Sequence, residues 1–167
     1  GPGQRHLTRG IASRAFGGWK ITGMQIYASG TPIGFTINNN LPIGNASQRP
    51  NIISPNMRSS VSADAFDPAK DLWLNPAAFA IPAAYTFGNA PRNSSVRSPM
   101  VMNENFGLLK DTKWGERFNW QIRFECTNPF NRVVFGAPVS NFSSGSFGRI
   151  TSARGGRSIT LGTKFYF

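Results

Sequence analysis

The 167-residue chain contains one cysteine and one histidine, and this scarcity excludes several kinds of chemistry. Cys126 has no partner for a disulfide within the chain. A zinc site needs about four clustered ligands, and a nucleophilic triad needs a histidine held in place. His6 stands in a glycine-rich terminal stretch, where it is expected to belong to an arm or a strand edge. We therefore expect no enzyme activity, no metal site and no cofactor.

The sequence also lacks long apolar runs and the 3.6-residue spacing of helix formers. No run approaches the roughly 18 to 20 apolar residues of a membrane-spanning helix. The first residues lack the order of a signal peptide, so any export signal is expected to lie outside this sequence. Both a helical bundle and a helical membrane protein are excluded, and we expect a single β unit over residues 1–167.

Charge is scarce and of mainly one sign. Charged residues make up 15% of the chain, and 18 Lys and Arg against 7 Asp and Glu give a formal charge of +11. Arginines interleaved with aromatics are typical of single-strand nucleic-acid grooves. Here the basic residues are dispersed singly and no nucleic-acid signature is present, so they are expected to line a barrel lumen or to face lipopolysaccharide. No nucleic-acid partner is expected.

Prolines concentrate in the middle of the chain. Residues 30–98 hold eight of the twelve prolines, and proline cannot donate a hydrogen bond to a strand ladder. A long loop is therefore expected over 30–98, with a short helical turn near 71–81 and Trp73, Phe79 and Phe87 as anchors. A loop of this length is unusual unless it has a function. Before it, residues 1–18 are expected to form an arm or edge, with a weak strand from Leu7 to Phe16.

Strict alternation of apolar and polar residues appears in the last third of the chain. Phe118, Trp120, Ile122, Phe124 and Cys126 are apolar, and every residue between them is polar. This pattern predicts a strand with two different faces. The same reasoning predicts strands at Met100 to Lys110, Glu116 to Thr127 and Arg157 to Phe167, with Asp111 to Glu116 as a hairpin connection and a second loop over 128–156. A strand at Trp19 to Ser29 is predicted from its β-branched and aromatic residues and from the turn signal Gly30-Thr31-Pro32 that follows.

Two architectures fit these strands. Segments of about 9 to 11 alternating residues with aromatics and loops of unequal length are typical of an outer-membrane β-barrel. A soluble antiparallel sheet with one solvated face alternates in the same way. The aromatic character of the apolar face and the two long loops favour the barrel. We expect an all-β fold of antiparallel strands of the outer-membrane barrel type, with long loops, incomplete as a barrel in this chain alone.

Several short motifs, in order along nearly the whole chain, together resemble a known family. The motifs are Gly17-Gly18-Trp19-Lys20-Ile21-Thr22-Gly23, Ser29-Gly30-Thr31-Pro32, Asn75-Pro76-Ala77-Ala78-Phe79, Thr86-Phe87-Gly88-Asn89, Arg92-Asn93, Arg123-Phe124-Glu125 with Asn128, Phe130-Asn131, Phe135-Gly136 with Pro138, Phe147-Gly148-Arg149-Ile150-Thr151 and Ile159 to Phe167. In this order they resemble the C-terminal barrel segment of Oar-like TonB-dependent outer-membrane receptors.

The resemblance implies a plugged barrel of about 22 strands that moves a large solute with energy passed on by TonB. It also implies that Phe165, Tyr166 and Phe167 act as the signal read by the outer-membrane assembly machinery. The solute could be a carbohydrate, in which case exposed loop aromatics and amides would contact it. Loop packing is the alternative role for these candidates, which are Trp73, Tyr85, Asn38, Asn39 and Asn40.

Two functional hypotheses remain open. In the first, the chain is the non-catalytic barrel portion of a TonB-dependent transporter in the bacterial outer membrane, and Phe118, Trp120, Ile122, Phe124 and Cys126 face lipid. In the second, it is a self-assembling extracellular β-protein, a filament subunit, in which these side chains face other subunits. Unpaired strand edges recruit further strands by donation or edge pairing, so the expected partners are the rest of the barrel or further copies of the chain.

Overall fold

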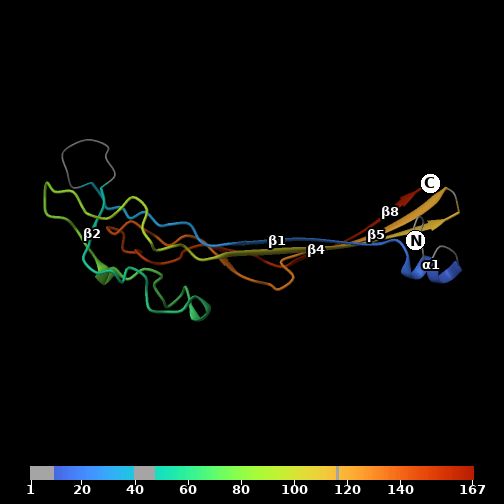
Figure 1. Cartoon of the computed structure of the whole chain (residues 1–167), viewed down its shortest axis with the longest axis horizontal. Helices are drawn as coiled ribbons and strands as arrows, with labels where there is room; N and C mark the ends of the chain where they lie inside the picture. The colour runs from blue at the N-terminus through green and yellow to red at the C-terminus, as the bar shows by residue number, and fades with distance from the viewer. Residues whose placement is uncertain (1–9, 40–47, 116) are drawn as a thin grey trace. The chain divides into compact units, whose positions relative to one another are not determined.

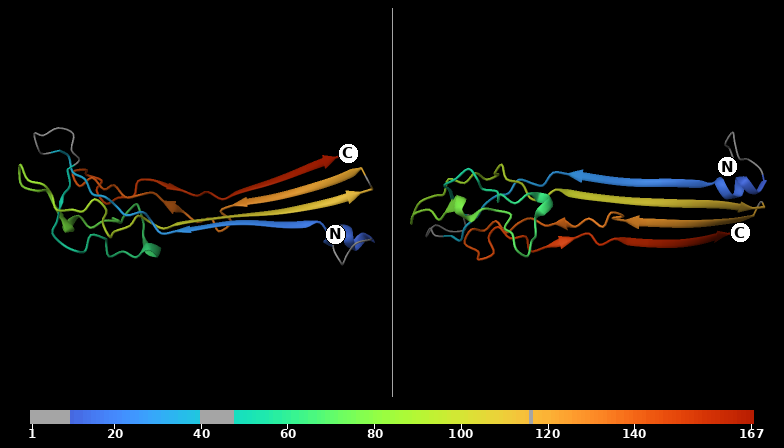
Figure 2. Two further views of the ribbon diagram at one scale, coloured as in Figure 1. Left: turned by 45° about the horizontal axis from the view of Figure 1, so that its top comes forward. Right: turned by 90° about the horizontal axis from the view of Figure 1, so that it is seen from below.

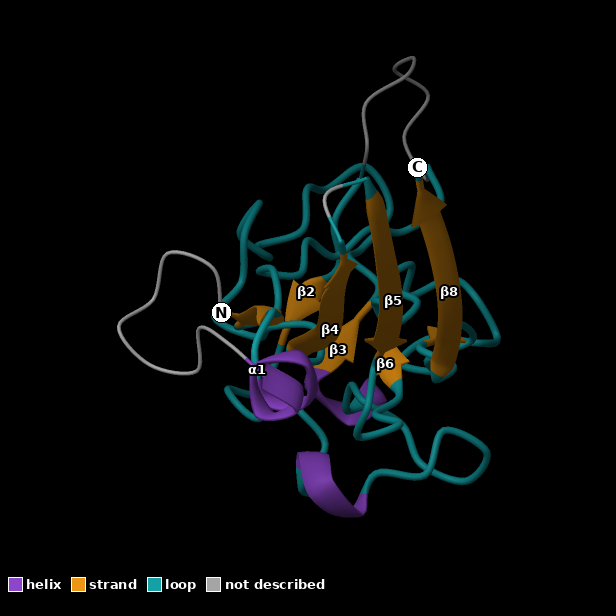
Figure 3. Ribbon diagram, turned by 90° about the vertical axis from the view of Figure 1, so that its right-hand side faces the viewer, coloured by secondary structure: helices purple, strands orange, loops and turns teal. Residues whose placement is uncertain are grey.

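The computed structural model describes residues 10–39, 48–115 and 117–167, and β-strands are its main regular elements (Figure 1). Figure 3 colours the strands orange and the short helical segments purple. In chain order, the elements are α1 (Gly10–Phe16), β1 (Trp19–Ala28), β2 (Asn51–Ile52), η1 (Ala63–Ala65), η2 (Pro76–Ala78), β3 (Phe79–Ala80), β4 (Val101–Trp114), β5 (Phe118–Thr127), β6 (Val134–Phe135), β7 (Ala153–Arg154) and β8 (Ser158–Tyr166). The predicted all-β class with little helix is confirmed.

The chain divides into two compact units, which are described separately. The sheet unit combines Gly1–Tyr27, Met102–Val133 and Gly155–Phe167, and the loop unit combines Ala28–Val101 with Val134–Arg154. Segments far apart in the sequence therefore meet within each unit.

The sheet unit is built on four strands in the order β1-β4-β5-β8. Figure 2 shows neighbouring strands running in opposite directions. The β4–β5 pairing extends from Asn105 opposite Thr127 to Trp114 opposite Phe118, and the β5–β8 pairing from Asn119 opposite Tyr166 to Thr127 opposite Ser158. Among the described strands, β1 and β8 each have one neighbour, so the sheet is open and the barrel incomplete, as predicted.

Two local predictions in the sheet unit are wrong. Asp111 to Trp114 continue β4, because Asp111 pairs with Gln121 and its carboxylate accepts a 2.8 Å hydrogen bond from that amide. The turn is confined to the residues between Trp114 and Phe118, where Gly115 has φ +70°. Residues 10–16 of the predicted Leu7 to Phe16 strand form helix α1, held by a 3.0 Å hydrogen bond from the Trp19 indole to the Ala15 carbonyl, while residues 7–9 lie outside the described range.

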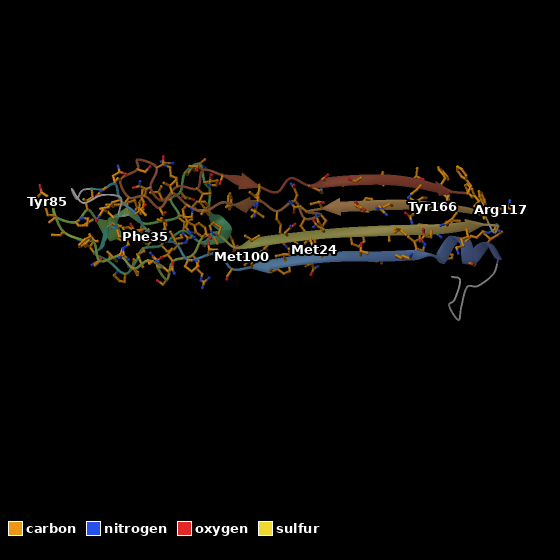
Figure 4. The ribbon with its side chains drawn as sticks, turned by 90° about the horizontal axis from the view of Figure 1, so that it is seen from above. Met24, Phe35, Tyr85, Met100, Arg117 and Tyr166 are labelled. Carbon is orange, nitrogen blue, oxygen red and sulfur yellow. The ribbon has the colours of Figure 1, made fainter. Side chains whose placement is uncertain are left out.

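The loop unit has an apolar core of its own. Phe35, Leu74 and Phe79 are almost fully buried, and the Phe35 ring lies 4.5 Å from Phe79 and 6.4 Å from Phe147. Figure 4 labels Phe35 among the side chains that fill this unit. The segment predicted as a loop over 30–98 and the one over 128–156 thus share a core, to which both contribute.

Side chains supply hydrogen bonds that the short strands of the loop unit cannot. The Asn89 carboxamide accepts a 2.7 Å hydrogen bond from the Ile52 amide. Asn75 caps the predicted helical turn, which forms as η2, by accepting a hydrogen bond from the Ala77 amide. Trp73 and Phe79 are buried anchors as expected, whereas Phe87 is 71% exposed and does not serve as one.

Candidate functional site

The register of the sheet determines which side chains share a face, because directly opposed residues of antiparallel strands project to the same side. Phe124 on β5 lies opposite Leu108 on β4 and Leu161 on β8, and all three are apolar. We call this side the apolar face. It consists of Phe106, Leu108 and Trp114 on β4, Phe118, Trp120, Ile122, Phe124 and Cys126 on β5, and Ile159, Leu161 and Phe165 on β8.

The apolar face retains much solvent exposure, especially toward β8. Leu161 is 74% exposed and Ile159 is 57% exposed, whereas Cys126 is buried. The five residues predicted to face lipid or another subunit therefore do lie together on one face. Apolar surface of this extent on a folded chain marks an interaction surface.

Aromatic rings gather on the apolar face near the β4–β5 hairpin. The Phe118 ring lies 6.4 Å from Trp114 and 5.9 Å from Phe165, which in turn stacks on Trp120. The Trp120 indole also donates a 2.7 Å hydrogen bond to the Thr163 hydroxyl. We call the four aromatic residues Trp114, Phe118, Trp120 and Phe165 the hairpin-end aromatic cluster. Aromatic rings at one end of an apolar band are typical of the girdle of a membrane β-barrel.

The opposite side of the sheet is polar and carries charges of both signs. Asp111 accepts hydrogen bonds from the Lys20 ammonium at 3.1 Å and the Gln121 amide at 2.8 Å, which links three strands. Arg123 and Glu125 form an exposed ion pair at 3.6 Å. A polar inner face opposed to an apolar outer one is the arrangement of a barrel wall.

Two charged residues stand on the apolar face, and sequence reasoning did not assign them a role. The carboxylate of Glu104, which is 2% exposed, accepts a 2.9 Å hydrogen bond from the Tyr27 hydroxyl and pairs with the Arg132 guanidinium at 3.1 Å. The Lys110 ammonium donates to the Arg14 and Gly17 carbonyl oxygens at 2.6 and 2.5 Å. Glu104 and Lys110 have even numbers, as Phe106 and Leu108 do, so alternation along the strand places them on the apolar face. A charge on that face needs a partner nearby, and this was the signal in the sequence that could have identified them.

The turn after β5 anchors Arg132. Asn128 adopts a positive φ of 52°, and its amide nitrogen donates a 2.8 Å hydrogen bond to the Glu104 carbonyl oxygen. Its side chain accepts from the Arg132 amide and donates to the carbonyl oxygens of Arg132 and Gly155. The turn thus ties β4, β5 and the segment before β8 together around the buried carboxylate.

The candidate solute contacts of the loop unit differ in their exposure to solvent. Trp73 is 5% exposed, with its indole donating a 2.9 Å hydrogen bond to the Arg97 carbonyl, so the expectation that it contacts a solute is wrong because the core encloses its ring. Tyr85 is 76% exposed with φ +62°, and Figure 4 places it at the periphery of the loop unit. Asn38 accepts a 3.2 Å hydrogen bond from Asn141, Asn39 is exposed, and Asn40 lies outside the described residues.

The three residues predicted as an assembly signal differ in where their side chains lie. Phe165 belongs to the apolar face, while Tyr166 lies on the polar face, where the Lys164 ammonium sits 4.7 Å from its ring centre. Phe167 follows β8 and is 99% exposed. Their role as a signal stays a prediction.

The helices of the described residues include none that is long and apolar enough to cross a membrane. The His, Cys, Asp and Glu side chains of the same residues nowhere gather in a group of three that could hold a metal ion.

An open antiparallel sheet with an apolar, aromatic-bordered face and a polar face defines the class of barrel walls that separate lipid from a polar interior. A family model described as an outer membrane beta barrel domain matches residues 1–160. The chain belongs to this family, and the outer membrane is its location. No curated protein and no solved structure matches it.

Proposed function

We propose that the chain forms a wall segment of a TonB-dependent outer-membrane transporter and that its role is non-catalytic. The observation that carries the proposal is the pairing of an apolar face with a polar face on one open sheet. The ordered motifs that resemble Oar-like receptors, from Gly17-Gly18-Trp19 to the end of β8, support the finer assignment.

Outer-membrane lipid is the proposed partner of the apolar face. Each aromatic side chain can bury on the order of 150 to 250 Å², and the hairpin-end aromatic cluster would sit at the level of the lipid headgroups. The polar face, with the linked Lys20, Asp111 and Gln121, would then line the barrel interior.

Further strands of the same barrel are the proposed partners of β1 and β8. An unpaired strand edge in lipid leaves N–H and C=O groups unsatisfied, at a cost of several kcal/mol each. Closure with additional strands removes both edges, and the large plugged barrels of transporters have about 22 strands.

A filament subunit is the second candidate, and the same two edges favour it. Edge pairing between copies would satisfy β1 and β8, and the apolar face would then contact protein in place of lipid. The two candidates differ in what touches Trp120.

Quenching of tryptophan by bromine on lipid acyl chains separates them. The full chain is refolded into vesicles with and without brominated lipid, and the quenched fraction of the fluorescence is measured. On the proposed function, Trp120→Phe lowers this fraction because a lipid-exposed indole is lost. Trp73→Phe raises it, because the indole removed is enclosed in the loop unit. Absence of quenching together with extended assemblies in electron micrographs would favour the filament.

Energy coupling requires a separate test in cells. Uptake of a fluorescent oligosaccharide by the receptor that contains this segment is measured with and without TonB. We expect uptake to stop without TonB while the amount of receptor in the outer membrane stays constant. Equal uptake in both strains would refute TonB dependence and leave the barrel assignment intact.

A further inference from the structure

The loop unit contains a cavity with both polar and apolar lining residues that the proposed barrel function does not by itself require. Its volume is about 620 Å³, within the range of roughly 300 to 1,000 Å³ typical of small-molecule sites. The lining residues used below are Asn56, Arg58, Ser60, Lys70, Asp71 and Asn75.

Arg58 is held in a defined position at this cavity. Its guanidinium carbon lies 3.4 Å from the centre of the Trp73 ring, and Nη1 donates a 3.1 Å hydrogen bond to the Trp73 carbonyl oxygen. Trp73 is itself fixed, because it is buried and its indole bonds to Arg97. Burial also lowers the pKa of the Arg58 guanidinium from its usual value. The side chain is therefore positioned in advance and partly stripped of water.

One carboxylate, that of Asp71, lines the cavity together with Arg58 but forms no ion pair with it. Asp71 accepts a 2.8 Å hydrogen bond from the Asp67 amide, and Asp67 pairs with Lys70 at 3.4 Å. None of the ion pairs formed among the described residues includes Arg58. Arg58 is therefore half-buried and has no carboxylate of the described part of the chain within ion-pair distance, so its charge can pair with an anion from outside the chain.

We propose that this cavity binds the carboxylate of an acidic saccharide. This inference rests on the proposed receptor function and names the class of its ligand. A guanidinium presents parallel donors that match the two oxygens of a carboxylate. Asn56 and Ser60 supply amide and hydroxyl groups suited to sugar hydroxyls. The Trp73 ring, in place of contacting the sugar, holds the arginine that does.

Binding is measured by isothermal titration calorimetry on the full chain in detergent micelles, with tri-galacturonate as the probe and uncharged maltotriose as its neutral counterpart. Arg58→Gln is expected to weaken tri-galacturonate binding by about tenfold or more, since hydrogen bonds to charged groups contribute about 1.5–3 kcal/mol. Arg58→Lys keeps the positive charge but lacks the parallel donors of the guanidinium, so its affinity for tri-galacturonate is expected to lie between those of the unsubstituted chain and Arg58→Gln. The matched control is Arg92→Gln, an exposed arginine of the same unit that does not line the cavity, and it should bind as the unsubstituted chain does.

Three outcomes would overturn the inference. They are equal affinity of Arg58→Gln and the unsubstituted chain, equal affinity for maltotriose and tri-galacturonate, and displacement by inorganic phosphate at lower concentration than by acetate, which would indicate a phosphorylated ligand. Near-ultraviolet circular dichroism identifies a variant that fails to fold. If Arg58→Gln fails to fold, the affinity of Arg58→Lys for tri-galacturonate is used in its place, and an affinity equal to that of the unsubstituted chain would overturn the inference. The titration needs no TonB, so TonB-independent uptake with intact binding would refute the proposed transport function and leave this site in place.

Discussion

The rings of Trp120 on β5 and Phe165 on β8 stack almost in parallel, with centroids 6.1 Å apart and planes inclined by 6°. The two residues are directly opposed in the strand register. Aromatic pairs of this kind contribute about 0.5–1.5 kcal/mol beyond their buried area. The pair joins two strands on the apolar face and borders that face near the hairpin.

Loss of the aromatic side chains of the apolar face should prevent membrane insertion. Replacing Trp120 and Phe124 together with serine removes two large apolar contacts with lipid and adds hydroxyls that need partners. The measurement is the fraction of chain that resists extraction from outer-membrane vesicles. Asn119→Ser with Glu125→Ser, on the polar face of the same strand, is the control and should leave this fraction unchanged. Equal extraction of both double variants would contradict a lipid-facing role.

Removal of Arg132 should destabilise the sheet unit by leaving the Glu104 carboxylate buried with the Tyr27 hydroxyl as its remaining described partner. Arg132→Ala is expected to lower the free energy of unfolding by about 1–3 kcal/mol, the cost of an unsatisfied buried group. Urea unfolding in micelles gives the value. Adding Glu104→Gln to Arg132→Ala should recover part of the loss, because the uncompensated charge disappears. A double variant less stable than Arg132→Ala would contradict this account.

The loop unit should depend on the Phe35 ring. Phe35→Ala leaves a cavity against Phe79 and Phe147 and should cost about 3–5 kcal/mol of unfolding free energy. Phe87→Ala is the matched control, because Phe87 is 71% exposed and its removal empties no core. Protection of backbone amides against hydrogen exchange, measured over residues 48–101, reports the loss. Similar protection in the two variants would argue against a packed core.

Acid should destabilise the loop unit in part through Asp67. The hydrogen bond from the Ala69 amide holds the pKa of this carboxyl below its usual value, and Lys70 acts in the same direction. Because the folded pKa is lower than the unfolded one, the contribution to stability is complete above the unfolded pKa of about 3.9 and disappears as pH falls through the folded value. Asp67→Asn should therefore flatten the decline in stability below about pH 4, measured by urea unfolding at a series of pH values. An unchanged slope would show that other groups control the acid response.

Periodicity along the chain was enough to predict β4, β5 and β8, and residue composition with a following turn signal predicted β1. Alternation of Phe118, Trp120, Ile122 and Phe124 with polar neighbours is a local property, since successive side chains of a strand project to opposite sides. The sequence could not locate the end of β4, because Asp111 looks like a turn residue until Gln121 and Lys20 provide its partners on the polar face.

By itself, the sequence determined the all-β class, the two-faced strands and the one-sided charge, because each depends on residue types at short spacing. Only the tertiary structure decided that Trp73 is buried while Tyr85 is exposed, that Glu104 has Arg132 as its partner, and that Arg58 lines a cavity unpaired. These outcomes depend on contacts between segments tens of residues apart. The burial of an aromatic ring or a charge is determined by the residues that pack against it, and the local sequence pattern does not specify which distant residues those are.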